Sequence, residues 1–199
     1  MTNAASARTG SGTFWDAKMN VMTRTVLPGD HAIEIGGDVA LVTLLGSCVA
    51  ACVRDPKTGT GGLNHFLLPD GAGADKGSAR YGVNAMELLI NDILKQGGRK
   101  DRLEAKVFGG GNVIDVSAEE TVGDRNGRFV TEYLRREGIT LIAADLGGAR
   151  ARRVFYFPTS GRATVLKLPV AENRRLRQEE LALKARAQSA PRSGGVELF

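Results

Sequence analysis

Short apolar runs separated by turn residues recur through the middle of the chain and limit what it can fold into. Runs of this length are typical of β-strands, because a buried helix needs a longer, periodic apolar pattern. The runs predict strands at residues 40–45, 49–53, 63–68, 104–108 and 139–144, the last of them buried, and a hairpin formed by residues 154–157 and 163–168.

Two segments have the spacing of helices instead. Apolar side chains recur every three or four residues between positions 81 and 96, and Gly97 and Gly98 follow, as is common after a helix. Residues 125–137 show a shorter version of this pattern, which ends at Gly138. Because strands and helices mix without strict alternation, the sequence predicts an α+β or mixed α/β protein.

Length and composition predict one domain with two tails. The chain has 199 residues, and 42% of them are hydrophobic, which suits a substantial core and excludes a disordered chain. Residues 1–25 are expected to form a flexible leader, and residues 26–170 the domain. Residues 171–199 are expected to form a basic C-terminal helix and tail. The apolar end of this tail, residues 196–199, is either a tethered docking peptide or a frayed terminus.

The sequence shows no sign of export or membrane insertion. No run approaches the roughly 18 apolar residues of a membrane span, and residues 1–25 contain no apolar block typical of a secretory signal. Two cysteines do not make a disulfide framework, so the expected location is the cytoplasm, where a thiol remains available for chemistry.

Positive charge is concentrated late in the chain. Residues 148–170 carry five basic side chains and no acidic one: Arg150, Arg152, Arg153, Arg162 and Lys167. Such a stretch can contact nucleic acid or an acidic protein surface. No zinc finger, RNA-binding aromatic motif or helix-turn-helix pattern accompanies it. A solvated strand pair is therefore the favoured interpretation, and no nucleic-acid partner is expected.

Cys48 is the candidate nucleophile. It follows Gly46 and Ser47 in a turn between two apolar runs, where a thiol can stand at a strand end. A free cysteine has a pKa near about 8.5 and needs a base to become a thiolate, and His65 on the next predicted strand can supply one. The alternative is that Cys48 is a small buried apolar residue, which is also the interpretation of Cys52.

Other candidate sites are weaker. Cys48, Cys52, His65 and His31 do not have the spacing of a zinc site, and no metal or other cofactor is expected. His31 follows turn residues and is expected at the surface. The glycines of 109–111 lack the motifs of nucleotide-binding loops, so they predict a tight strand exit or a backbone surface lining an active site.

Several motifs together resemble the family of CheD, the chemoreceptor glutamine deamidase. The resemblance spans about residues 27–168. It rests on residues 41–56 (LVTLLGSCVAACVRDP), 61–69 (GGLNHFLLP), 80–82 (RYG), 103–110 (LEAKVFGG), 122–126 (VGDRN), 145–148 (DLGG) and 152–154 (RRV).

The resemblance implies both a fold and a site. The fold class is α/β (α+β), a layered sandwich of mixed β-sheets with flanking helices and a papain-like Cys–His active site. Cys48 corresponds to the nucleophile, His65 to the base and Thr43 to the third catalytic residue. The stretch between Thr43 and Cys48 is one residue shorter than in some members, and a strict count selects Val42, which has no hydrogen-bonding side chain.

The implied activity is hydrolysis of glutamine side chains to glutamate on methyl-accepting chemotaxis receptors, through a thioester on Cys48 and without a cofactor. The implied partners are the helical receptors and a CheC-type phosphatase. The alternative function is that of a non-enzymatic adaptor that binds such a phosphatase. An adaptor has no need for a Cys48–His65 pair, so this pair discriminates between the two functions.

Overall fold

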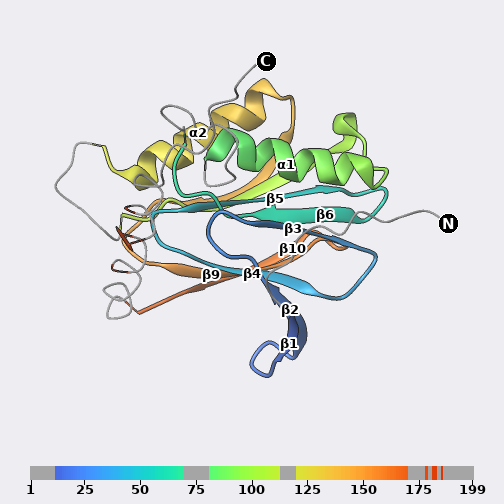
Figure 1. Cartoon of the computed structure of the whole chain (residues 1–199), viewed down its shortest axis with the longest axis horizontal. Coiled ribbons are helices and arrows are strands. Elements are labelled where there is room, and N and C mark those ends of the chain that lie inside the picture. The colour runs from blue at the N-terminus through green and yellow to red at the C-terminus, as the bar shows by residue number, and fades with distance from the viewer. Residues whose placement is uncertain are drawn as a thin grey trace, which may run out of the picture.

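The computed structural model describes residues 12–69, 81–112 and 120–169, together with Gln178, Leu181, Ala182 and Ala185. These residues form two β-sheets and two long α-helices, arranged as three layers (Figure 1). The elements are β1 (Thr13–Asp16), β2 (Val21–Thr25), β3 (His31–Ile35), β4 (Ala40–Leu45), β5 (Val49–Asp55), β6 (Thr60–Asn64), α1 (Gly82–Lys95), the 3₁₀ turn η1 (Lys100–Arg102), β7 (Glu104–Gly109), α2 (Val122–Arg136), β8 (Thr140–Leu146), β9 (Arg152–Phe157) and β10 (Arg162–Lys167).

Both sheets are mixed. The first sheet has the order β1-β2-β4-β9-β10, in which β2 and β4 run parallel and the other neighbours run antiparallel. The second sheet has the order β3-β6-β5-β7-β8, in which only β7 and β8 are a parallel pair. The α+β class and the layered sandwich are confirmed.

Apolar residues fill the two spaces between the layers. Leu41, Leu45, Val154 and Tyr156 of the first sheet pack with Ala50, Cys52 and Leu63 of the second in a core between the sheets. The opposite face of the second sheet packs against α1 and α2, so the helices cover only this sheet (Figure 1). The two helices are as predicted, except that α2 begins three residues early. Its first turn is stabilised by a capping box between Thr121 and Asp124.

The flexible leader predicted for residues 1–25 is wrong for its second half, where β1 and β2 form a hairpin that extends from the body (Figure 1). The turn between them is built on Asp16, whose Oδ1 accepts hydrogen bonds from the backbone N–H groups of Lys18 and Met19. Asn20 ends the turn with a φ of 53°. These are turn residues that the sequence shows, but strands this short carry little apolar pattern.

Two further strands differ from prediction. The strand predicted at 63–68 is formed by Thr60–Asn64, because Gly61 and Gly62 permit close packing that leaves no apolar signal. A Cβ at Gly62 would overlap the carbonyl oxygen of Ala32 on β3. The strand predicted to be buried at 139–144 forms β8 at the edge of its sheet, where Ile142 is 45% exposed.

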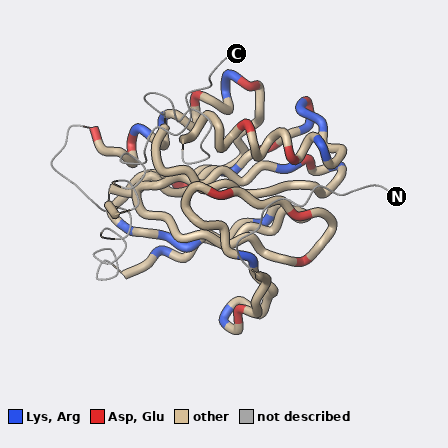
Figure 2. The backbone as a smooth tube through the Cα atoms, in the orientation of Figure 1, with Lys and Arg blue, Asp and Glu red and all other residues tan. Residues whose placement is uncertain are grey.

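The predicted hairpin of the basic segment is confirmed as the antiparallel pair β9–β10. Figure 2 shows basic residues recurring along this pair, where Arg153, Arg162 and Lys167 are exposed, whereas the helices carry both signs. Arg152 is an exception to the prediction of a solvated face, because it is buried.

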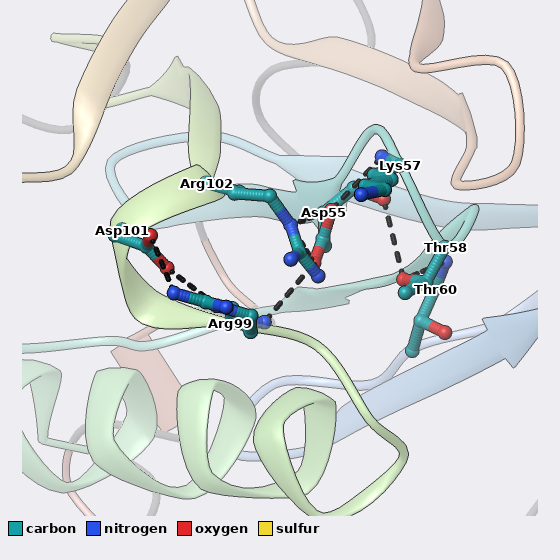
Figure 3. A network of polar contacts seen from close by, with 7 residues as sticks. All are labelled: Asp55, Lys57, Thr58, Thr60, Arg99, Asp101 and Arg102. Atoms are coloured by element: carbon teal, nitrogen blue, oxygen red, sulfur yellow. Dashed lines mark hydrogen bonds and ion pairs between the residues drawn. The ribbon is translucent and has the colours of Figure 1, made fainter.

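A polar network holds the far end of β5 in place (Figure 3). The Asp55 side chain is fully buried, and its carboxylate accepts hydrogen bonds from the Arg102 guanidinium and from the backbone N–H groups of Lys57 and Arg99. These donors, chiefly Arg102, hold the pKa of Asp55 well below its usual range. The contacts tie the β5–β6 turn to η1.

Some predictions lie outside the described residues. These are most of the C-terminal helix and the tip at 196–199. Within 171–199 the structure describes four residues, which are helical and exposed. No helix in the described part of the chain is both long and apolar enough to cross a bilayer.

Candidate active site

Cys48 is the last residue of the turn between β4 and β5. The exit of β7 packs directly against this turn: the N–H of Gly110 donates to the carbonyl of Cys48 and the N–H of Gly111 to the carbonyl of Gly46, both at 2.7 Å. Gly109 has a φ of 112°, and a Cβ there would overlap the Cys48 carbonyl oxygen. Glycine is therefore required at this strand exit so that the two backbones can meet.

His65 follows β6 directly and is held by its backbone. Its N–H donates to the carbonyl of Asp30 at 3.0 Å, and its own carbonyl accepts from the N–H of Gly29 at 2.7 Å. The turn between β2 and β3 therefore fixes the peptide groups on both sides of the imidazole.

The structure brings Thr43 and His65 together across the two sheets. Thr43 lies on β4 of the first sheet, and its Oγ1 is 2.8 Å from Nδ1 of His65. The same hydroxyl donates to the carbonyl of Val26 at 2.7 Å. A threonine hydroxyl has a single proton. Since Val26 takes that proton, Thr43 accepts from Nδ1–H of His65, and the lone pair of the neutral ring lies on Nε2.

The register of β4 decides which neighbour takes this position. Thr43 pairs with Val154, whose side chain lies in the core between the sheets. Val42 pairs with Phe155 and packs with it on the outer face of the first sheet. Adjacent residues of a strand point to opposite faces, so Thr43, and not Val42, faces His65.

Cys48 and His65 are related through the two residues that follow them. Val49 and Phe66 form an antiparallel bridge with N–H···O distances of 3.2 and 3.0 Å, and both side chains pack under the helices. Cys48 and His65 therefore point to the other face, into the space between the sheets. In this register they are diagonal neighbours, close enough for side chains of their length to interact.

All three side chains are deeply placed. The exposed fractions of Cys48, His65 and Thr43 are 1%, 2% and 2%. Burial strengthens the hydrogen bonds and charge interactions of such a cluster, because little water is present to compete. A thiol, an imidazole of defined tautomer and an orienting hydroxyl are the components of a cysteine hydrolase.

Sequence reasoning assigned no role to Asn126, which the structure places against the Cys48 turn. Its Nδ2 donates to the carbonyls of Ser47 and Leu67, both at 3.0 Å, from the inner face of α2. A polar residue on the buried face of an otherwise amphipathic helix is the signal that could have drawn attention to it.

Arg152 stabilises the loop that packs against the glycines of residues 109–111. Its guanidinium donates to the carbonyls of Asp145 and Gly147, and the N–H of Gly147 donates to the carbonyl of Gly109. Burial lowers the pKa of Arg152, and the Asp145 carboxylate partly offsets this effect. The buried guanidinium therefore anchors the loop that packs on the β7 exit.

The remaining candidates lie elsewhere. Cys52 is buried in the core between the sheets, as predicted, and burial raises its pKa well above the ordinary value. His31, predicted at the surface, is only partly exposed: it begins β3, and its Nε2 lies 2.9 Å from Oδ2 of Asp92 on α1. Within the described ranges no group of three or more His, Cys, Asp or Glu side chains is arranged to hold a metal ion.

Fold and contacts together define an α+β sandwich protein in which a Thr–His pair lies beside a cysteine-bearing turn. The family profile described as CheD chemotactic sensory transduction matches residues 67–167. A Xanthomonas campestris protein named probable chemoreceptor glutamine deamidase CheD is 50% identical over 186 residues, which are 94% of this chain and 93% of that protein. A Janthinobacterium protein of the same name is 45% identical over the full length of both chains. This chain belongs to the CheD family.

Among solved structures, the Bacillus licheniformis protein YfiH has a TM-score of 0.40 and 14% identity, covering 62% of this chain and 58% of that one. This likeness is too low to bear on the fold or the function.

Proposed function

We propose that this chain is a protein-glutamine deamidase that converts glutamine side chains of chemotaxis receptors to glutamate. Its CheD relatives carry that activity in their names. The observation that carries the proposal for this chain is the bond between Thr43 and His65, with the Thr43 proton committed to Val26. That arrangement leaves Nε2 as the basic atom of an imidazole whose diagonal neighbour across the strand pair is Cys48.

The proposed reaction has two halves. Nε2 of His65 takes the proton of Cys48, and the thiolate attacks the γ-carboxamide carbon of glutamine. The C–N bond of the resulting tetrahedral intermediate then breaks, His65 gives the proton to the departing ammonia, and a thioester remains on Cys48. In the second half His65 takes a proton from water, hydroxide attacks the thioester carbonyl, and glutamate and the free thiol are released.

Oxyanion stabilisation is proposed to come from backbone N–H groups of residues 46–48. The three carbonyls of this turn are held by Gly110 and Gly111, which follow β7, and by Asn126 of α2. A turn fixed in this way presents its N–H groups without rearranging during the reaction, which is the condition for effective electrostatic stabilisation.

The proposed substrate is a helical receptor surface in the cytoplasm. The exposed basic side chains of Arg150, Arg153 and Arg162 supply a surface of the sign that an acidic helix requires. An adaptor that binds a CheC-type phosphatase remains the alternative function, and the experiment below separates the two.

The test uses the purified chain with the cytoplasmic fragment of a methyl-accepting receptor. Glutamine-to-glutamate conversion is followed by peptide mass spectrometry, and ammonia release by a coupled assay. Cys48→Ala is expected to abolish both signals, because no other nucleophile takes its place. Cys52→Ala removes the other cysteine, four residues away in the same core, and is expected to retain activity. Unchanged conversion by Cys48→Ala contradicts the mechanism, and an inactive wild-type chain that still binds a CheC-type phosphatase favours the adaptor.

A further inference from the structure

The turn that carries Cys48 is held by three consecutive carbonyls. The Gly46 and Cys48 carbonyls accept from the backbone N–H groups of Gly111 and Gly110. The Ser47 carbonyl accepts from a side chain, Nδ2 of Asn126. Of the three contacts only this one can be removed by a substitution that leaves the backbone donors in place.

Asn126 also reaches the segment that follows His65. Its second N–H donates to the carbonyl of Leu67, two residues beyond the imidazole. One amide therefore joins the chain segment that carries the cysteine to the segment that carries the histidine. Both bonds measure 3.0 Å, and together they use both protons of the Nδ2 group.

Burying the side-chain amide of Asn126 is energetically unfavourable for one of its atoms. Asn126 is completely buried, and its Oδ1 has no hydrogen-bond partner among the described residues. A buried acceptor without a partner is unfavourable and uncommon in native proteins. The two donated bonds are thus the reason for an amide at this position of α2.

From these contacts we infer that Asn126 is a positioning residue for Cys48, an inference that rests on the proposed deamidase function. The Ser47–Cys48 peptide is trans, so its carbonyl and its N–H point in opposite directions. By holding the Ser47 carbonyl toward α2, Asn126 turns the Cys48 N–H away from the helix. It thereby sets both the direction of this N–H and the placement of the thiol opposite His65.

The test compares Asn126→Ala with the wild-type chain on the receptor fragment. Misplacing a reacting group by about 1 Å can lower the rate about 100-fold, so kcat is expected to fall about 10- to 100-fold. KM is expected to change less than about threefold, because Asn126 touches no substrate. Should Asn126→Ala fail to fold, Asn126→Ser, which keeps one shorter donor, is measured in the same way.

A second measurement does not depend on the substrate. Alkylation of Cys48 by iodoacetamide follows the fraction of thiolate, which depends on the nearby imidazole. In the variant the pH profile of alkylation is expected to shift to higher pH. A merely loosened fold would instead speed alkylation at every pH.

The control is Asp55→Asn, which weakens the fold at the far end of β5 from Cys48. The positioning role is overturned if Asn126→Ala and Asp55→Asn, compared at matched thermal stability, lose the same amount of kcat. It is also overturned if the kcat of Asn126→Ala stays within about twofold of wild type. If the wild-type chain deamidates nothing but the alkylation profile still shifts, the proposed function fails and the positioning of Cys48 stands.

Discussion

The hydroxyl of Thr43 and the imidazole of His65 join the two sheets of the sandwich through a 2.8 Å bond at the candidate active site. Thr43 comes from the first sheet and His65 from the end of a strand in the second. The orientation of the proposed base therefore depends on how the two sheets pack, and not on either sheet alone.

Replacing Thr43 with valine tests this contact. The Thr43→Val side chain has nearly the same shape but leaves Nδ1 of His65 without its acceptor, so the ring loses its preferred tautomer. A positioned base contributes about 100-fold or more to such reactions, and we expect deamidation to slow by about 10- to 100-fold. Thr43→Ser keeps the hydroxyl and is expected to retain most of the activity, measured as kcat by mass spectrometry.

The matched control is Thr23→Val on β2. Thr23 is also buried, and its hydroxyl donates to the carbonyl of Phe14 on β1. This variant loses a comparable hydrogen bond without touching the site. Equal losses of activity in Thr23→Val and Thr43→Val would contradict the orienting role.

The two cysteines are expected to differ in reactivity although they are equally buried. Burial raises the pKa of Cys52, and the nearby positive charge of Lys106 offsets this effect only in part. Cys48 is a diagonal neighbour of His65 across the strand pairing and is expected to be alkylated first by iodoacetamide under native conditions. Mass mapping of the modified peptides measures this. Preferential labelling of Cys52 in the folded chain is the outcome that conflicts with the assignment.

The pair of the buried Asp55 and the partly exposed Arg102 is expected to contribute to stability in a pH-dependent way. Asp55→Asn leaves the guanidinium without its charged partner and is expected to lower the free energy of unfolding by about 2 kcal/mol at neutral pH.

The sign of the pH effect follows from the lowered pKa of Asp55. Its contribution is complete above the unfolded-state pKa of about 3.9 and is lost as the pH falls toward the folded-state value. Urea titrations of the wild-type chain and of Asp55→Asn at neutral and acidic pH should therefore show that the difference in their free energies of unfolding becomes smaller as the pH falls. A difference that stays constant down to low pH would rule out this explanation.

Gly109 is expected to tolerate no side chain. In Gly109→Ala the new Cβ meets the Cys48 carbonyl and the backbone has a φ of 112°, so we expect a loss of about 3 kcal/mol together with loss of activity. Gly97→Ala is the comparison, because Gly97 also has a positive φ, of 88°, but its Cβ would meet nothing within 4 Å. Thermal denaturation of Gly109→Ala and Gly97→Ala separates the effect of overlap with the Cys48 carbonyl from the effect of backbone strain. Equal effects would show that contact with the Cys48 turn is irrelevant.

The local pattern of the sequence was sufficient for most elements of the fold. β4 was predicted to the residue because it is an apolar run of strand length, and α1 to within one residue at each end because its apolar residues have helical periodicity. β6 was misplaced because its glycines pack closely without apolar side chains. The β1–β2 hairpin was missed because its short strands carry little apolar pattern and its signal is confined to the Asp16 turn.

Part of the candidate site could likewise be predicted from the sequence, and part depended on the tertiary structure. Residue type and local spacing made Cys48 and His65 candidates, since a thiol in a small-residue turn and a histidine on the next strand are local features, and the resemblance to the CheD family assigned their roles. Tertiary structure alone decided between Thr43 and Val42, because a one-residue change in strand register reverses the direction of a side chain. It also decided that Val26 takes the Thr43 proton and that Asn126, 79 residues from Ser47, holds the Cys48 turn. Such contacts depend on how sheets and helices pack, which no local pattern of residues encodes.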